Sequence, residues 1–468
     1  MSSKKPKRSS KNLKINTRIV LTTVLAIAIP LVLVALVVVF ALAKKLRLTT
    51  ELSMLTATIA AVLIHLILPQ GEDPRSPLPF VEIVRHLVEG SVTYLDICLL
   101  FLTATFFMTI YKESGGVAYI VRVIVKTFHA HRFVCLILLT AVMLVPGAIT
   151  GSGATTVLTV GGLVSAVLVA MGVPEDRRVA LIFILAAMSA ACPPINLWAM
   201  MAAAGSNMPY VGFTVPLGFL SIVGALFATF YLAGKGEKIH LDEAMATLPE
   251  PPKGWNGLRA ALPFLVLIVI ILCGRVIPES FPVVGLPLTF MLCAGTVLLV
   301  APKGTKINVI DVACTTVKNL QGLVGIMVVV GMLNQIMTLT GARGLLSLAV
   351  VTLPVAVLFA TLWIILPVAE GVLQYAVAPL FGVPLIMLFN MLGYDPIVAL
   401  STWAVMLPLG DCLPPTAVVG RAAVMELDYK GNYYKGFVKT ALVPMLFILA
   451  MSTVVMIFSK QIGAFIGG

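Results

Sequence analysis

Two long stretches without a charged residue limit what this chain can fold into. Residues 133–174 and residues 179–234 are 42 and 56 residues long, and neither contains Asp, Glu, Lys or Arg. At about 1.5 Å per residue, one helix of the shorter stretch would reach about 63 Å, about twice the hydrocarbon thickness of a bilayer. We therefore expect each stretch to turn back inside or near a membrane.

The composition supports a membrane protein. Hydrophobic residues make up 60% of the 468 residues, charged residues make up 11%, and the mean hydropathy is +1.06. These values exclude a soluble globular domain and a disordered chain. Further apolar runs predict an all-α polytopic membrane protein with about 11 to 13 membrane helices.

Each long stretch contains a segment that interrupts a helix. In the first stretch it runs from Pro146 to Gly153, and in the second it is Cys192-Pro193-Pro194-Ile195-Asn196. Proline and glycine break the helix, and small hydroxyl residues can bond the freed backbone groups. We expect a hairpin at the first segment and a broken helix at the second.

These interruptions recur later in the chain. Pro146, Gly172, Pro193 and Pro194 match Pro367, Gly393, Pro414 and Pro415, each at an offset of 221. Paired interruptions in corresponding hydrophobic segments are typical of secondary transporters. The alternative is that Gly and Pro are simply common in membrane helices.

The repeat and the charges predict five parts. They are a basic tail (1–18), an extra N-terminal membrane helix (19–43), a first half (44–234), a linker (235–259) and a second half (260–468). The net charge is +12, and ten basic residues lie in residues 1–47. The positive-inside rule places the tail in the cytoplasm, although Lys44, Lys45 and Arg47 favour the opposite orientation.

The breaks of the first half supply neutral candidate ligands. Broken helices expose carbonyl groups that suit Na⁺ and N–H groups that suit a carboxylate. The candidates for substrate or ion binding are Thr150, Gly151, Ser152, Gly153, Thr155, Thr156, Ser189, Pro193, Pro194 and Asn196. The alternative is that these small residues only let helices pack closely.

The second half carries charge at the corresponding places. Glu370, Asp411 and Arg421 interrupt apolar segments, and a charge at the bilayer centre costs about 2.5 to 3.5 kcal/mol on insertion scales. We expect Glu370 or Asp411 to bind a cation or carry a coupled proton, and Arg421 to meet an anionic substrate. The alternative is an ion pair between Arg421 and an acid that only stabilises the fold.

Several functions are disfavoured by missing motifs. The sequence has no Walker A motif, no H-E-x-x-H and no G-x-S-x-G, so neither ATP-driven transport nor an enzyme is expected. The basic charge is concentrated at the edge of a membrane domain, so we expect no nucleic-acid partner. We expect no cofactor.

Four motifs resemble those of the large membrane subunit of tripartite ATP-independent periplasmic (TRAP) transporters, the DctM-like permeases of the ion transporter superfamily. They are Gly151-Ser152-Gly153-Ala154-Thr155-Thr156-Val157, similar to G-S-x-x-A-T; Cys192-Pro193-Pro194-Ile195-Asn196, similar to I-P-P-S; Leu392-Gly393-Tyr394-Asp395-Pro396, similar to L-G-[IY]-D-P; and Leu413-Pro414-Pro415-Thr416-Ala417, similar to T-P-P-V-G.

The resemblance implies two inverted repeats, each with a re-entrant hairpin and a broken helix, in an elevator-type transporter of the bacterial inner membrane. It implies uptake of organic acids such as C4-dicarboxylates in symport with Na⁺. The sodium sites would lie near Ser152, Asn196 and Thr416, with Pro414 and Pro415 beside the last. The implied partners are the lipid bilayer, a small four-helix permease subunit and a periplasmic substrate-binding protein.

The chain departs from this family in carrying Glu370, Asp411 and Arg421. A stand-alone cation-coupled anion transporter or exchanger of the same superfamily is therefore a second hypothesis. A membrane scaffold or receptor that does not transport is a third.

Overall fold

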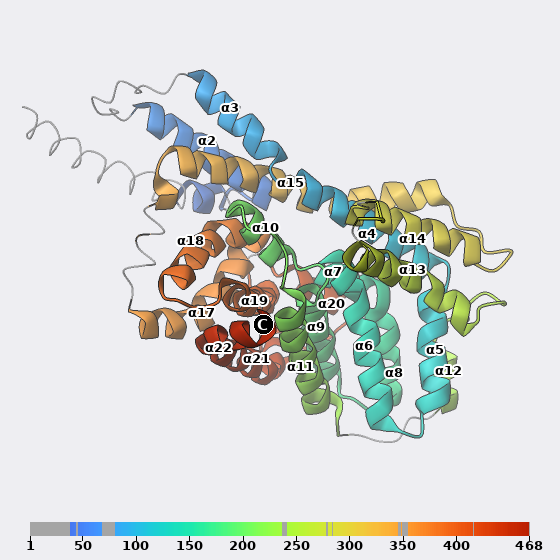
Figure 1. Cartoon of the computed structure of the whole chain (residues 1–468). Coiled ribbons are helices and arrows are strands. Elements are labelled where there is room, and N and C mark those ends of the chain that lie inside the picture. Colours follow the sequence, from blue (N-terminus) through green and yellow to red (C-terminus); the bar gives the residue numbers. More distant parts are fainter. Residues whose placement is uncertain are drawn as a thin grey trace, which may run out of the picture. The chain divides into compact units, whose positions relative to one another are not determined.

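The computed structural model describes residues 38–43, 45–67, 80–235, 241–277, 279–282, 284–344, 348, 354–414 and 416–467. These residues form α-helices with short 3-10 and π-helical turns and no strand (Figure 1). The all-α prediction is confirmed. The predictions for the tail 1–18, for most of the span 19–43 and for Pro415 fall outside the described residues.

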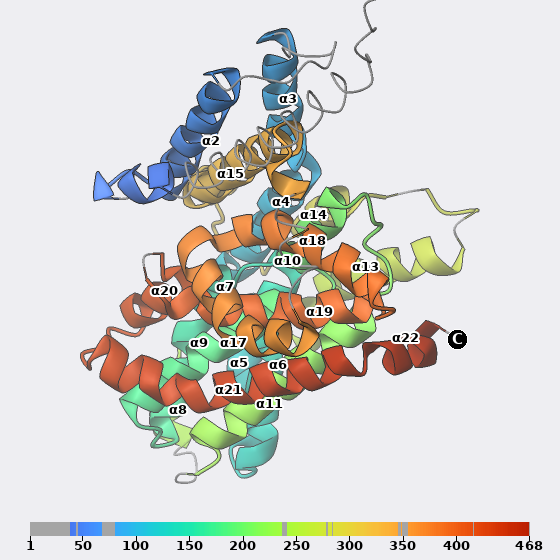
Figure 2. The same ribbon diagram turned by 90° about the vertical axis from the view of Figure 1, so that its left-hand side faces the viewer.

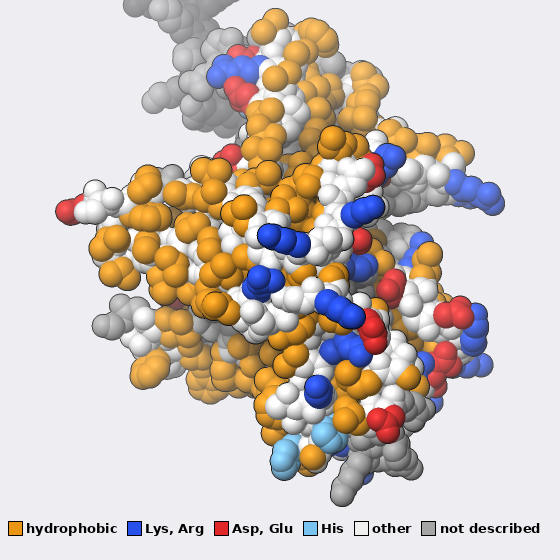
Figure 3. Space-filling model, turned by 90° about the vertical axis from the view of Figure 1, so that its right-hand side faces the viewer, with side chains coloured by type: hydrophobic (Ala, Val, Ile, Leu, Met, Phe, Trp, Pro, Cys, Tyr) orange, Lys and Arg blue, Asp and Glu red, His pale blue; other side chains and the backbone are white. Residues whose placement is uncertain are grey.

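Eight helical stretches in the described part of the chain are long and apolar enough to cross a membrane. They are Phe80–Glu113, Arg132–Thr150, Gly153–Ala170, Thr214–Ala233, Gly257–Gly274, Val309–Leu339, Ala356–Met391 and Tyr433–Ile457. Many of their large apolar side chains are exposed, and Figure 3 shows such side chains covering much of one face. Lipid stabilises a surface of this kind, so the chain is a multi-pass membrane protein.

The chain packs into two compact units, which we describe separately. The first comprises the described residues within Met1–Leu95 and Gly325–Thr352. It contains α2 (Thr50–Ile67), α3 (Phe80–Val92) and the C-terminal part of α15 (Val309–Leu339). A Cβ at Gly90 would lie 2.7 Å from the Gly331 carbonyl oxygen, so α3 and α15 approach each other at two glycines.

The second unit comprises the remaining described residues and holds all the candidate site residues. Its helices before the linker are α4 (Leu95–Glu113), α5 (Gly116–Phe128), α6 (Arg132–Thr150), α7 (Gly153–Thr156), η1 (Val157–Gly161), α8 (Gly162–Ala170), α9 (Glu175–Ala191), α10 (Leu197–Gly205) and α11 (Thr214–Ala233).

The later helices of this unit are α12 (Leu241–Thr247), α13 (Gly257–Val276), α14 (Leu286–Val300), the N-terminal part of α15, α17 (Val355–Leu373), η2 (Gln374–Ala376), α18 (Val377–Met391), α19 (Pro396–Met406), η3 (Leu407–Cys412), α20 (Val418–Glu426), η4 (Tyr433–Val438), α21 (Lys439–Ile457) and α22 (Ser459–Gly467).

The centre of the second unit is α9, which packs against α6, α11 and α21 (Figures 1 and 2). Every residue of α9 from Val179 to Ala191 is buried. This explains why the first part of the stretch 179–234, residues 179–191, is apolar throughout. A helix that is hydrophobic on all sides is typical of one that the rest of the protein surrounds.

Both predicted interruptions occur. Helix α6 continues through Pro146 and ends at Thr150, where Gly151 adopts a left-handed conformation with φ 67°. The chain therefore turns at the end of the predicted segment and not at its proline. The Gly151 N–H donates to the Gly147 carbonyl oxygen at 2.6 Å and so closes the end of the helix. A residue with a Cβ would be strained in the left-handed conformation of Gly151.

The offset of 221 that relates the interruptions in the sequence also relates the boundaries of the helices. Helix α9 (Glu175–Ala191) corresponds at an offset of 221 to α19 with η3, which cover Pro396–Cys412. At the same offset α10 (Leu197–Gly205) corresponds to α20 (Val418–Glu426). The two repeats therefore share their element order, lengths and break positions, and we call them the first segment (α6 to α11) and the second segment (α17 to α21).

Candidate functional site

The hairpin turn of the first segment is closed by its own hydroxyl groups. The Ser152 Oγ accepts a bond from the Thr155 N–H at 3.2 Å, which caps α7. The Thr150 hydroxyl donates to the Pro146 carbonyl at 2.8 Å and accepts from the Ser152 N–H at 3.2 Å. Side chains thus replace the helix bonds that the turn removes.

The hairpin is joined to α9 by a pair of buried hydroxyls. Thr156 and Ser189 are both 0% exposed, and their hydroxyl oxygens are 2.7 Å apart. Ser189 also donates to the Ala186 carbonyl at 2.7 Å. Gly147 gives Ser189 its room, because a Cβ at Gly147 would lie 2.6 Å from the Ser189 carbonyl carbon.

We predict that Thr156→Val lowers the free energy of unfolding by about 1 kcal/mol, because it removes one buried interhelical hydrogen bond. Thermal unfolding of the purified protein in detergent measures this change. Thr296→Val is the matched control, since the half-buried Thr296 donates only within its own helix, to the Leu292 carbonyl at 2.8 Å. Equal effects of the two substitutions would contradict the prediction.

The doubled proline of the first segment ends α9 and leads into α10. Asn196 caps α10 through its Oδ1, which accepts from the Ala199 N–H at 2.9 Å, while its Nδ2 donates to the Ala191 carbonyl at 3.0 Å. The Ile195 N–H reaches the Ala148 carbonyl at 3.1 Å. Asn196 thus holds the two ends of the break together, and its neighbour ties the break to the hairpin.

The second segment repeats this tie. The N–H and the hydroxyl of Thr416 both donate to the Gly371 carbonyl, at 3.1 and 2.8 Å. The three residues predicted near sodium therefore divide between two places. Ser152 and Asn196 lie at the breaks of the first segment, and Thr416 lies at the equivalent break of the second.

Neutral oxygens of this kind are common ligands of monovalent cations. Ser152 and Thr416 are 6% and 8% exposed, and Asn196 is fully buried. A hydroxyl oxygen has two lone pairs, so the Ser152 oxygen retains one after its capping bond. Around Na⁺ these residues would supply oxygen ligands beside free helix ends.

Each segment's post-break helix packs against the other segment's hairpin. Helix α20 of the second segment lies against α7 and η1 of the first, where a Cβ at Gly153 would be 3.1 Å from the Val419 Cγ2. Helix α10 of the first segment lies against α18 of the second, where Gly382 meets Ala202. The four interruptions therefore belong to one interlocked region.

Glu370 and Asp411, proposed from sequence as alternatives, lie together in this region. Glu370 in α17 is 0% exposed and Asp411 in η3 is 5% exposed, and the two carboxyl groups interact electrostatically. Helix α17 and η3 are in close contact because Gly410 of η3 faces the backbone of Pro367 in α17. A Cβ at Gly410 would lie 2.7 Å from the Pro367 Cα. The structure thus places two interacting acids on adjoining elements in the protein interior.

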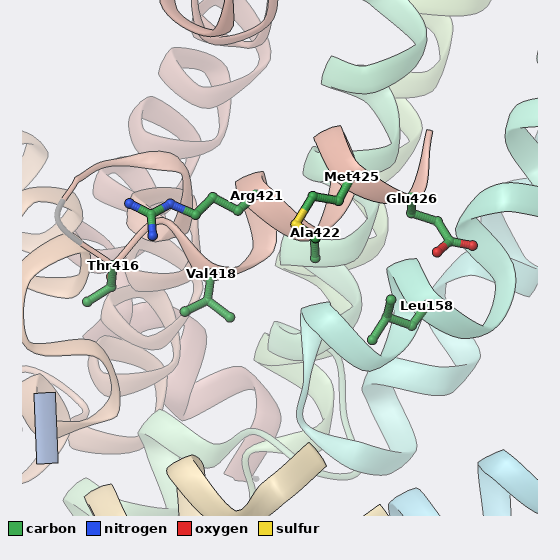
Figure 4. A pocket seen from close by; sticks show the side chains of 7 residues that line it. All are labelled: Leu158, Thr416, Val418, Arg421, Ala422, Met425 and Glu426. Carbon is green, nitrogen blue, oxygen red and sulfur yellow. The ribbon is translucent and has the colours of Figure 1, made fainter. Parts of the chain in front are cut away.

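Arg421 lines a separate, open cavity of about 520 Å³. Its lining residues are Leu158, Thr416, Val418, Arg421, Ala422, Met425 and Glu426. Figure 4 shows the guanidinium group on the side of Thr416, and the Glu426 carboxylate pointing the other way near Leu158. The cavity is therefore bordered by both segments and joins the predicted arginine to one predicted sodium residue.

The two segments are also tied outside the membrane helices. The Tyr429 hydroxyl donates to the Asp176 carboxylate, and the Lys430 N–H donates to the Glu175 Oε1 at 3.1 Å. Burial, and then the bond to Asp176, raise the pKa of the Tyr429 hydroxyl above its usual range. The loop after α20 is thereby held at the start of α9.

Sequence reasoning missed the aromatic residues around the acids. Trp198 in α10 is fully buried beside Glu370, and its ring stacks on Tyr375 with a centroid distance of 5.1 Å. Tyr433 donates to the Cys412 carbonyl at 2.9 Å. The sequence could have indicated Trp198, because it is the one residue in the first turn after the break that has a large side chain with a polar group at its end.

Comparisons with known proteins identify the fold. No family model and no curated protein matches the chain. The structure is similar to that of MtrF of Neisseria gonorrhoeae, described with a class of antimetabolite efflux pumps, with a TM-score of 0.61 and 14% identity over 86% of this chain and 94% of MtrF. It is also similar to the YdaH transporter of Alcanivorax borkumensis, with a TM-score of 0.54 and 14% identity over 83% of this chain and 90% of YdaH.

The chain therefore has a fold that is also found in membrane transporters. Neither MtrF nor YdaH is described as a member of the family suggested by the four sequence motifs. At 14% identity the similarity concerns the fold alone.

Proposed function

We propose that this protein is a secondary active transporter of the bacterial inner membrane, which couples the movement of an organic anion to that of cations. The observation that carries the proposal is the interlocked region, where four chain interruptions meet beside a cavity bordered by Arg421. The fold shared with MtrF and YdaH supports it. The two segments would act as inverted repeats that move as an elevator.

Dicarboxylates such as succinate are the proposed substrate class, and Na⁺ is the proposed coupling ion. A guanidinium group binds a carboxylate through two parallel hydrogen bonds, and Arg421 can offer such a pair into the cavity. Sodium would bind at the breaks, near Ser152 and Asn196 and near Thr416. Proton coupling at Glu370 or Asp411 would complement these neutral sites.

The charge of the substrate and the membrane potential together set the smallest number of cations that must enter with each substrate molecule. Moving a dianion inward against 100 mV costs about 4.6 kcal/mol, and each entering monovalent cation returns about 2.3 kcal/mol. Two sodium ions only balance the substrate charge. Uptake driven by the membrane potential needs at least three cations for each dicarboxylate.

The first candidate is the large permease of a TRAP-type system, which works with a small four-helix subunit and a periplasmic binding protein. The second candidate is a stand-alone transporter. The structural comparison favours the second candidate, because this chain alone covers 94% of MtrF, which is itself a single chain.

We expect the purified chain in liposomes to exchange external [¹⁴C]succinate for internal succinate. A Na⁺ gradient and an inside-negative potential should drive its accumulation in the stand-alone case, while a TRAP-type permease should transport only after both partners are added. Liposomes with K⁺ in place of Na⁺ are the control. If no organic acid is transported under either condition, the chain is a non-transporting scaffold or receptor and the proposal is wrong.

A further inference from the structure

Glu370 combines full burial with carboxyl oxygens that have no partner. It is 0% exposed, and neither Oε1 nor Oε2 has a hydrogen bond among the described residues. A buried carboxylate without a partner is costly, so such groups bind a cation or become neutral. Glu370 is therefore poised to take up a positive charge.

The described groups that face Glu370 supply no such charge. Among the described residues, Glu370 faces Asp411 from η3, Trp198 from α10 and Tyr375 from η2. Asp411 also faces Cys412 and Tyr433, and Tyr433 in turn faces Arg421. None of the groups that face Glu370 is basic, so the acids repel each other when both are ionised.

Trp198 provides an independent observation. Its side chain is fully buried beside Glu370, and its Nε1 has no hydrogen-bond partner among the described residues. An indole N–H can only donate, and a carboxylate can only accept. The indole N–H therefore lies beside two carboxyl oxygens and interacts with them without forming a well-aligned hydrogen bond, in an arrangement that a change of charge on Glu370 can reorganise.

We propose that Glu370 and Asp411 form one binding site for a single exchangeable monovalent cation, a proton or Na⁺, and that Trp198 reports its occupancy. This site adds two acidic groups to the neutral oxygens at the chain breaks. It rests on the proposed function, for which it supplies the third coupling charge that a dicarboxylate requires. Because the cation is shared, loss of either acid removes the whole site.

The first experiment needs no substrate. The purified full chain in detergent is titrated with Na⁺ against K⁺ at fixed pH, and with pH in K⁺ buffer, while tryptophan emission is recorded. Subtracting the spectrum of Trp198→Phe isolates the Trp198 signal. We expect a saturable change in at least one titration, and the titration that shows it identifies the cation.

The variants decide whether the two acids act as one site. Glu370→Gln and Asp411→Asn should each abolish the change, and the double variant should resemble either single variant. Glu279→Gln, an exposed acid, is the control and should retain it. No change in either titration, or a change that persists in either single variant, would overturn the proposal.

The second experiment separates this proposal from the proposed function. In liposomes, Glu370→Gln and Asp411→Asn should reduce cation-driven [¹⁴C]succinate accumulation at least about tenfold more than succinate exchange, because a neutral side chain mimics the occupied site. Equal losses of accumulation and exchange would overturn the coupling role. Absence of exchange in the wild-type protein would refute succinate as substrate, and the fluorescence titration would still decide the cation site.

Discussion

Gly410→Ala is expected to lower the free energy of unfolding by about 3 kcal/mol or more and to abolish transport. Inserting a methyl group into a packed core costs about 1 to 3 kcal/mol when side chains can yield. Here the new Cβ would lie 2.7 Å from both the Pro367 Cα and the Pro367 carbonyl carbon. Because these are backbone atoms, α17 and η3 would have to separate and the acid pair would be displaced.

The yield of monodisperse protein and the thermal unfolding midpoint measure this effect. Gly295→Ala in α14 is the matched control, since a Cβ there would meet nothing within 4 Å. That substitution should leave stability unchanged or raise it slightly, because alanine favours the helix. A Gly410→Ala protein as stable as the Gly295→Ala control would show that this close approach does not hold the two elements together.

Replacing Arg421 should weaken the apparent affinity for succinate about 10-fold in Arg421→Lys and about 100-fold in Arg421→Ala. A hydrogen bond to a charged group contributes about 1.5 to 3 kcal/mol, and lysine keeps the charge but loses the paired geometry. Arg421 lines the cavity beside Thr416, where a carboxylate would meet both side chains. Concentration-dependent [¹⁴C]succinate exchange in liposomes measures the affinity.

Arg177→Ala is the control for charge alone, because Arg177 is exposed at the start of α9 and does not line the cavity. It should leave the apparent affinity within about twofold of the wild-type value. If Arg421→Lys retains wild-type exchange kinetics and Asp411→Asn retains wild-type cation-driven accumulation, the charged residues of the second segment serve only the fold.

The sequence predicted the interruptions well because proline and glycine act on the local backbone. Gly172 and Gly393 have φ values of 69° and 72°, so the matched glycines found in the sequence take up the same left-handed turn. Pro146 was less informative. A proline changes the bonding of the preceding turn but can remain inside a helix that packing holds in place, as α6 shows.

The assembly of the site could be predicted only in part. Glu370 and Asp411 stood out as charges in apolar segments, but their contact depends on how α17 meets η3, which residue spacing does not reveal. Trp198 reaches Glu370 from the first segment, 172 residues earlier in the chain. Contacts between segments of this kind follow from tertiary packing, so a charge pattern alone suggested alternatives where the structure shows a pair.

The close crossings at the two hairpins have a consequence for building hybrid proteins. In the first segment the glycine lies on the hairpin helix, at Gly147, and faces Ser189. At the equivalent place of the second segment the glycine lies on the facing element, at Gly410, and Val368 occupies the hairpin helix. Moving the second hairpin alone into the first segment would therefore place Val368 against Ser189. Moving the first hairpin alone into the second segment would place Gly147 against Gly410 and leave a gap. A viable exchange must move a hairpin with the helix it crosses, which makes the crossing pair the smallest transferable part of this fold.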